Sequence, residues 1–361
     1  MKASKIAINA RLFPIGEAKN AGLPRAYLTQ KRNPYLVIGQ LPDQRRIVIN
    51  ERENHTPGVF SGWLVPKEAA EKRLSPDSID KVVVKFSRSE VFDFWHNLEV
   101  SLLAQLDPLV PQIPIILYQG KASVTLHSSI TNGLLWREAP YFVMTKFRGQ
   151  TFDKLAESWQ TRPPHRHELI ELLNTFNRLA RLLAKVHGEN GEPAMIVHRD
   201  LKPLNLINEV DQPRVLDFGS ANYLNGRIKR RDVGTAGFFP PEFLAAGLTE
   251  DDPRIDTYGL AATFITVLSG NRPLMYPGVT SPWLGEDLQE NAERYARQVW
   301  EHREKTAAEL MKASNFPDDL KETPLAQFLF TMVHPNRELR PARMNEIADK
   351  FSGFREELTA V

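Results

Sequence analysis

The chain has 361 residues, which is long enough for one large domain or for two lobes with substantial cores. Its 46 Lys and Arg against 44 Asp and Glu leave a net charge of +2, so bulk charge argues against a nucleic acid or a membrane surface as a partner. The absence of Cys excludes disulfides and thiolate zinc sites. We see no signal-peptide core and no apolar run of about 18 residues, so we expect a cytoplasmic protein.

The first third of the chain has mainly strand patterns. Residues 1–34 are basic and weakly patterned, and we expect an extension there. YLVIGQ (35–40) and RRIVINE (45–51), separated by LPDQ, predict a hairpin. The apolar run KVVVKF (81–86) predicts another strand, and the insert at 66–81 favours a helix.

A helix and two more strands are predicted next. Residues 92–106 (FDFWHNLEVSLLAQL) carry apolar side chains at helical spacing. IPIILYQ (113–119) and YFVMTKF (141–147) are strand candidates, and the polar residues around 119–139 predict a linker between them.

After residue 150 the pattern becomes helical. Residues 169–187 form an amphipathic repeat that ends at His187–Gly188, and LNLIN (204–208) and PRVLDF (213–218) are short strand candidates. Residues 255–270 predict a buried helix and 285–313 a charged one. A strand-rich part followed by a helical part predicts two lobes with a break near 148–150.

The segment IVHRDLKPLNLI (196–207) places charged side chains inside an apolar frame. Asp200 and Asn205 stand five residues apart there, and Asp217 follows 17 residues after Asp200, at the start of a DFG tripeptide. Carboxylate and amide oxygens are hard ligands that suit Mg²⁺ beside phosphates. Each piece alone has an ordinary structural explanation, but the combination favours a catalytic loop with a metal site.

HRDLKPLN followed by DFG resembles the catalytic loop and metal motif of eukaryotic-type (Hanks-type) serine/threonine protein kinases, over residues 46–355. The resemblance implies that Asp200 accepts the proton of a substrate hydroxyl. It also implies that Lys202 neutralises the transferred phosphoryl group and that Asn205 and Asp217 hold Mg²⁺. Arg199 would steady the activation segment.

Lys85 in VVVKF is the candidate lysine for the α- and β-phosphates of ATP, because an ammonium on an apolar strand needs compensating charge. Glu99, 14 residues later on the predicted helix, resembles its ion-pair partner in the family; Glu90 and Asp93 are alternatives. An edge-strand lysine that points to solvent is the ordinary structural reading.

The phosphate-binding loop is less well defined. The sequence has no GxGxxG, and TPGVFSGW, with Gly58 and Gly62 around Phe60, is the best candidate. Two glycines permit close approach of backbone N–H groups to phosphates, but they are equally typical of a hairpin turn.

YFVMTKF resembles the family's hinge segment, which implies an adenine site. Met144 would be the gatekeeper, and Thr145 to Phe147 would offer backbone groups to the base. Val83 would lie above the adenine and Ile207 beneath it. A plain buried strand is the alternative reading of this segment.

GTAGFFPPE (234–242) resembles the end of an activation segment and disfavours a small-molecule kinase. Thr235 would bond the catalytic Asp and Lys. Glu242 with Arg340 resembles a buried ion pair, and Asp256 resembles a residue that braces the catalytic loop. Between 221 and 233 the one hydroxyl is that of Tyr223, so we expect constitutive or partner-driven activation, with Asp232 as a built-in anion.

These motifs predict an α+β, two-lobed protein-kinase-like fold, with a β-rich N-lobe that has one helix and a larger helical C-lobe. We expect an extension at 1–45, an N-lobe at 46–148 and a C-lobe at 149–361.

The predicted function is Ser/Thr phosphorylation of protein substrates in signalling, with ATP and Mg²⁺. The alternative is a pseudokinase or ATP-binding scaffold. The 285–313 helix is a candidate docking surface; we expect neither nucleic acid nor membrane as partner.

Overall fold

The computed structural model describes residues 35–360 with short gaps, at 57, 67–78, 88–89, 129–132, 163, 192, 210–211, 225–233, 246–249, 271–273, 277–278 and 280–287. The chain divides into two compact units. The first contains the residues up to 104 and residues 114–146, and the second contains residues 105–113 and those from 147 onward. The extension expected at 1–34 and the helix expected within 66–81 lie mostly outside the described residues.

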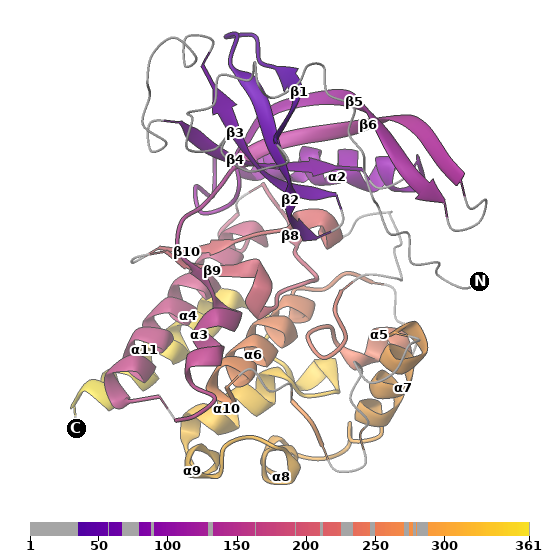
Figure 1. Ribbon diagram of the computed structural model, residues 1–361. Helices are drawn as coiled ribbons and strands as arrows, with labels where there is room; N and C mark the ends of the chain where they lie inside the picture. The colour runs from indigo at the N-terminus through magenta and orange to yellow at the C-terminus, as the bar shows by residue number, and fades with distance from the viewer. Residues whose placement is uncertain are drawn as a thin grey trace. The chain divides into compact units, whose positions relative to one another are not determined.

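The first unit is built on a six-stranded antiparallel sheet in the order β1-β2-β3-β4-β6-β5 (Figure 1). Its strands are β1 (Tyr35–Gln40), β2 (Arg46–Thr56), β3 (Val59–Val65), β4 (Asp80–Phe86), β5 (Ile116–Ser128) and β6 (Gly133–Thr145). The predicted β1–β2 hairpin is confirmed by a register that pairs Gln40 with Arg46. The extension expected at 1–45 includes residues 35–40, but these residues form a strand of this sheet.

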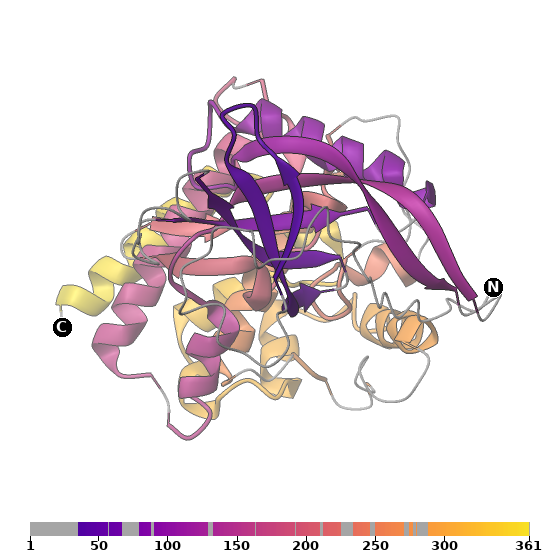
Figure 2. The same ribbon diagram turned by 45° about the horizontal axis from the view of Figure 1, so that its top comes forward.

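The prediction of a polar linker at 119–139 is wrong. Strands β5 and β6 continue through these residues as one long antiparallel hairpin, in register from Gln119 opposite Phe142 to Ser128 opposite Gly133 (Figure 2). The alternation of Ala122, Val124 and Leu126 with polar residues is the period-two signal of a strand with one apolar face, and the high polar content concealed it.

Alternation along β4 sets the core of the first unit. Val82, Val84 and Phe86 are buried on one face, with Phe86 edge-on to Phe60 at a ring distance of 5.9 Å. The intervening Lys85 is therefore directed to the opposite face of the sheet. Helix α2 (Glu90–Leu106) confirms the helix predicted from the apolar spacing.

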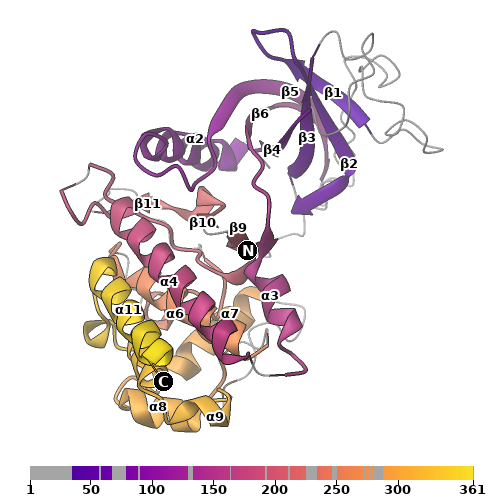
Figure 3. The same ribbon diagram turned by 90° about the vertical axis from the view of Figure 1, so that its left-hand side faces the viewer.

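The second unit is mainly helical, and its core lies among three long helices. These are α4 (Arg166–Val186), α6 (Arg254–Leu268) and α11 (Met344–Ala360). Phe176 of α4 stacks on Phe264 of α6 at 4.1 Å, and α4 and α11 lie side by side (Figure 3). Helix α6 is buried along almost its whole length, which confirms the buried helix expected at 255–270.

Short elements complete the second unit. The strands are β7 (Gln150–Thr151), β8 (Ile196–Val197), β9 (Leu206–Glu209), β10 (Gln212–Val215) and β11 (Asn222–Tyr223). The remaining α-helices are α3 (Phe152–Ser158), α5 (Pro241–Ala245), α7 (Leu288–Trp300), α8 (Ala307–Ala313), α9 (Asp318–Lys321) and α10 (Pro324–Met332), and η4 (Pro203–Asn205), η5 (Phe218–Ser220) and η6 (Arg337–Leu339) are single 3₁₀ turns.

The single charged helix expected at 285–313 is wrong, because the described part of this range forms two helices, α7 and α8. Thr306 begins α8 with a reciprocal capping box, in which its hydroxyl accepts from the backbone N–H of Glu309 and the Glu309 carboxylate accepts from the backbone N–H of Thr306. Helix α7 also buries Tyr295 and Val299, so it is not a fully solvated helix. Docking of a partner on this segment stays a prediction.

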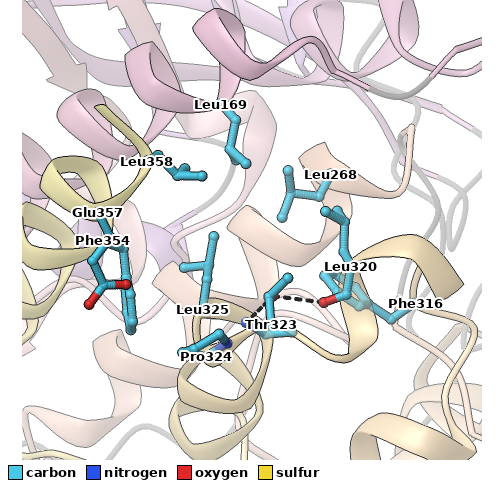
Figure 4. A pocket seen from close by; sticks show the side chains of 11 residues that line it. Leu169, Leu268, Phe316, Leu320, Thr323, Pro324, Leu325, Phe354, Glu357 and Leu358 are labelled. Atoms are coloured by element: carbon cyan, nitrogen blue, oxygen red, sulfur yellow. Dashed lines mark hydrogen bonds between the residues drawn. The ribbon is translucent and has the colours of Figure 1, made fainter. Parts of the chain in front are cut away.

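The second unit contains an apolar pocket of about 270 Å³ (Figure 4). Leu169 of α4, Leu268 of α6 and Leu358 of α11 line it, and the Thr323 hydroxyl donates to the Leu320 carbonyl instead of serving a ligand. Glu357 is the one charged residue among those that line it, and none of them is basic, so the pocket is not a candidate phosphate site.

The fold class is α+β, as predicted, with a β-rich unit in which the described residues form helix α2, and a larger, mainly helical unit. The exact limits expected for the domains stay a prediction. Within the residues that the structure describes, no helix is long and apolar enough to cross a membrane.

Candidate active site

In the first unit, Lys85 is paired with Glu99. The Lys85 Nζ donates to Glu99 Oε1 at 2.8 Å, and the two side chains are 13% and 3% exposed. Lys85 is directed away from the apolar face of β4, and α2 carries Glu99 to it. The pair therefore forms within one unit. Of the three carboxylates considered from the sequence, Glu99, Glu90 and Asp93, the partner of Lys85 is Glu99, which was the preferred one.

The two glycines of TPGVFSGW both have structural roles. Gly58 has φ = 87°, which is the left-handed conformation, and its carbonyl accepts from the Phe86 N–H at 2.8 Å. A Cβ on Gly62 would lie 2.7 Å from the Val48 carbonyl oxygen of the neighbouring strand. Phe60 lies in the core of the sheet. A role for Gly58 or Phe60 in nucleotide binding stays a prediction.

The residues expected around adenine are divided between the two units of the chain. Val83 of β4 is paired in register with Met144 of β6, and Thr145 follows at the end of that strand. In the second unit, Ile207 of β9 is paired with Thr151 of β7, and the Phe147 ring lies 4.6 Å from the guanidinium of Arg214. Contact of any of them with a base stays a prediction.

The loop that carries Asp200 is held by buried hydrogen bonds to Asp256. The Asp256 carboxylate accepts from the backbone N–H groups of His198 and Arg199, both at 2.8 Å, and contacts His187 Nε2 at 2.9 Å. Burial alone would raise the pKa of Asp256, but the His187 contact and the bonds from the loop outweigh it and hold this pKa below its ordinary value. These bonds fix Arg199 at φ = 70°, which is costly for a non-glycine residue.

Asp200 is the centre of a side-chain cluster. Thr235 Oγ1 donates to Asp200 Oδ1 and Lys202 Nζ donates to Asp200 Oδ2, each at 2.7 Å. The same Nζ donates to Thr235 Oγ1 at 2.7 Å, so the three groups form a closed triangle. Asn205 Nδ2 donates to the Asp200 carbonyl at 2.9 Å. The structure therefore brings Asp200, Lys202, Thr235 and Asn205 together.

Asn205 and Asp217 belong to two segments that a backbone hydrogen bond joins. The Asn205 carbonyl accepts from the backbone N–H of Leu216, the residue before Asp217, at 2.8 Å. Because the Asn205 amide nitrogen faces Asp200, its side-chain oxygen is directed away from that carboxylate. Asp217 has a left-handed backbone, φ = 56°, and contacts the Gly219 N–H. One amide oxygen and one carboxylate are a donor set that fits Mg²⁺.

No cluster of three or more His, Cys, Asp or Glu suited to a metal occurs among the described residues. A site with one carboxylate therefore matches Mg²⁺, which keeps water and phosphate ligands, better than it matches Ca²⁺ or Zn²⁺.

Arg199 has a counter-ion that sequence analysis missed. Asp251 lies 3.2 Å from the Arg199 Nε, both side chains are buried, and Asn222 Nδ2 donates to Asp251 at 2.6 Å. Burial lowers the pKa of Arg199 and raises that of Asp251, against the attraction between the two charges. Asp232, expected as the anion here, lies outside the described residues.

Glu242 and Arg340 form a buried, two-pronged ion pair. Both guanidinium Nη atoms donate to the carboxylate at 2.7 Å, and the side chains are at most 1% exposed. Arg340 also donates to the His334 and Pro335 carbonyls. The pair joins α5, just after the Thr235 segment, to the residues that precede α11, and confirms the contact expected from the sequence.

The fold and these side-chain clusters are those of the protein-kinase class, and comparison with known families agrees. The family model described as the protein kinase domain matches residues 119–352, which include Asp200, Lys202, Asn205, Asp217 and Thr235. The chain belongs to the protein kinase domain family. The match does not reach Lys85 and Glu99, so their assignment depends on the ion pair itself.

Among curated proteins, the chain is similar to the phosphorylase b kinase gamma catalytic chain, liver/testis isoform, of Mus musculus, with 30% identity over 36% of this chain and 30% of the relative. Cysteine-rich receptor-like protein kinase 14 of Arabidopsis thaliana is 24% identical over 67% of this chain and 32% of the relative. Sperm motility kinase Z of Mus musculus is 33% identical over 29% and 20%. The aligned parts span between 11% and 39% of the relatives' lengths.

Proposed function

We propose that this chain transfers the γ-phosphoryl group of ATP to Ser or Thr side chains of proteins, including its own. The observation that supports this most is the triangle of Asp200, Lys202 and Thr235. A carboxylate held by an ammonium and a hydroxyl is a fixed acceptor for the proton of an incoming hydroxyl. The Thr235 contact also matches the pattern that the family resemblance implies for Ser/Thr-specific members.

In the proposed reaction the substrate hydroxyl oxygen forms the new bond to the γ-phosphorus while the bond to the ADP oxygen breaks. The hydroxyl proton passes to an oxygen of Asp200. Lys202 stabilises the charge on the transferred group, and Lys85, oriented by Glu99, binds the remaining phosphates. Positioning and charge neutralisation supply most of the rate in such transfers, and a rigid loop supplies both.

Asn205 and Asp217 would hold Mg²⁺, which when bound neutralises phosphate charge. The two residues are fixed relative to each other through the hydrogen bond between the Asn205 carbonyl and the Leu216 N–H. The Asn205 amide is further oriented by Asp200.

An assay with Mg²⁺ and ATP, followed by mapping of the phosphorylated sites, tests the proposed function. We expect phosphate on Ser and Thr of a generic protein substrate and of the chain itself. Phosphate found on Tyr alone would contradict the Ser/Thr assignment, and binding of ATP without any transfer would favour the second candidate below.

The second candidate is a nucleotide-binding pseudokinase that acts as a scaffold. The structural roles of Gly58 in a left-handed turn and of Gly62 in close strand packing favour it, because neither glycine is then kept for phosphate binding. Binding of ATP by calorimetry together with undetectable turnover is the result that this candidate predicts.

Replacing Lys85 is expected to remove activity and to lower stability. In Lys85→Met, Glu99 keeps a carboxylate that is 3% exposed and loses its ammonium partner, so we expect the free energy of unfolding to fall by about 3 kcal/mol. Adding Glu99→Gln to Lys85→Met removes the buried charge and should restore much of the stability but none of the activity. Denaturant unfolding and the kinase assay separate the two effects. A double variant that regains turnover would contradict the role of Lys85.

We propose that activity does not require a phosphate on the activation segment, because Asp251 already supplies an anion at Arg199. Phosphatase treatment of the wild type should leave kcat unchanged. Asp251→Asn should lower kcat by about tenfold, which corresponds to roughly 1.4 kcal/mol of barrier. Asp252→Asn is the matched control, since Asp252 pairs with Arg254 instead. Stoichiometric phosphate between residues 221 and 235 that is required for turnover would refute this proposal.

A further inference from the structure

Arg214 of β10 is held on three sides within the second unit. Its Nε donates to Glu209 Oε2 at 2.8 Å, and its Nη1 donates to the Pro111 carbonyl, also at 2.8 Å. The guanidinium carbon lies over the Phe147 ring, 4.6 Å from the ring centroid. The side chain is 17% exposed, so these three contacts leave it little freedom.

The same residue lies beside Ile207. Arg214 stands directly opposite Ile207 in the antiparallel pairing of β9 with β10, and directly opposed residues direct their side chains to the same face. Arg214 therefore contacts Phe147 through its guanidinium and adjoins Ile207 across the hairpin. Phe147 and Ile207 are the two residues of the second unit that we expect at the adenine base.

A guanidinium suits this position because it is planar. It donates in its plane to Glu209 and to the Pro111 carbonyl, while its face stacks on an aromatic ring. The Glu209 carboxylate also neutralises the charge, and two of the guanidinium nitrogens are already engaged. This arrangement favours a role in holding the neighbouring chain segments over a role in binding phosphate.

We propose that Arg214 is a positioning residue for the base of ATP, which holds Phe147 and Ile207 in the arrangement that the adenine ring requires. This inference rests on the proposed function. It adds that affinity for the base depends on a side chain outside the catalytic motifs. A site ordered before its ligand arrives binds more tightly, so the effect falls on nucleotide affinity and not on the transfer step.

Calorimetry of the full chain with adenosine, and separately with tripolyphosphate and Mg²⁺, distinguishes binding of the base from binding of the phosphates. In Arg214→Ala we expect the Kd for adenosine to rise about tenfold, because the competent arrangement becomes the minor one, and the Kd for tripolyphosphate to stay within about twofold. KM for ATP should rise by about the same factor as the Kd for adenosine, while kcat at saturating ATP stays within about twofold of the wild type.

Arg214→Lys keeps a cation beside Glu209 and tests the inference should Arg214→Ala fail to fold. It should recover little affinity for adenosine, because one ammonium cannot stack on the ring and also donate to two oxygens in a fixed plane.

Phe147→Leu tests the path of the effect. If Arg214 acts through the Phe147 ring, Phe147→Leu should weaken adenosine binding as well, and adding Arg214→Ala to it should cause little further loss. Arg181→Ala is the matched control, because Arg181 is 45% exposed and pairs with Asn345 and Asp349. This control should bind adenosine like the wild type.

Three results would overturn the inference and leave the proposed function standing: adenosine binding by Arg214→Ala within about threefold of the wild type, equal losses for adenosine and tripolyphosphate, or additive losses in the double variant. A wild type that binds neither adenosine nor ATP would contradict the proposed function itself, and the inference with it.

Discussion

The Asp200→Asn variant is expected to fold like the wild type and to lose phosphoryl transfer by a factor of about 10²–10⁴, the usual contribution of a positioned general base. Asn has almost the same shape as Asp, so the loop and its bonds to Asp256 should persist. An amide cannot take up the hydroxyl proton, however. It also presents an NH₂ group to a site where Thr235 and Lys202 already donate.

The measurements are kcat, KM for ATP and the midpoint of unfolding, each beside the wild type. We expect kcat to fall while KM for ATP changes little, since Asp200 acts on the acceptor and not on the nucleotide. Asp318→Asn is the control, because that carboxylate is 94% exposed and lies on α9, outside the site. Turnover of Asp200→Asn within about threefold of the wild type would show that another group accepts the proton.

Sequence patterns predicted the fold well where periodicity is strong and side chains are buried. Helix α4 ends at Val186, directly before the expected His187–Gly188, and β4 occupies the apolar run that contains Lys85. The predictions were wrong where polar residues concealed the pattern, as in the β5–β6 hairpin, or where a local cap divides a charged stretch, as at Thr306. Patterns report burial, and both errors fall on segments in which polar residues outnumber apolar ones.

The catalytic loop was predictable because its chemistry is local in the sequence. Asp200, Lys202 and Asn205 lie within six residues, and Asp217 is brought to Asn205 by the antiparallel pairing of β9 with β10. The Asp251 contact with Arg199 was not predictable in this way. The segment EDDPR (250–254) has the composition of an ordinary turn before a helix. Its Asp251 carboxylate meets Arg199 only through tertiary packing beside β11.

The second large effect is expected for stability, at the ion pair of Glu242 and Arg340. Arg340→Met leaves the Glu242 carboxylate buried without its guanidinium and removes the donors to the His334 and Pro335 carbonyls. We expect the free energy of unfolding to fall by about 3–5 kcal/mol, as found when one partner of a buried pair is removed. Arg340→Lys should recover little of this, because an ammonium cannot reproduce a planar fork that donates to four oxygen atoms.

Denaturant unfolding of Arg340→Met, Glu242→Leu and the double variant measures the pair directly. We expect the double variant to be less destabilised than the sum of the single changes by about 1–3 kcal/mol, since it buries no unpaired charge. Arg343→Met is the control: Arg343 lies three residues away, is 56% exposed and pairs loosely with Glu346 at 3.7 Å. An exposed pair of this kind contributes at most about 0.5 kcal/mol. If Arg340→Met and Arg343→Met were equally stable, the buried pair would contribute no more to folding than an exposed one, and its function would have to be sought in positioning the Thr235 segment.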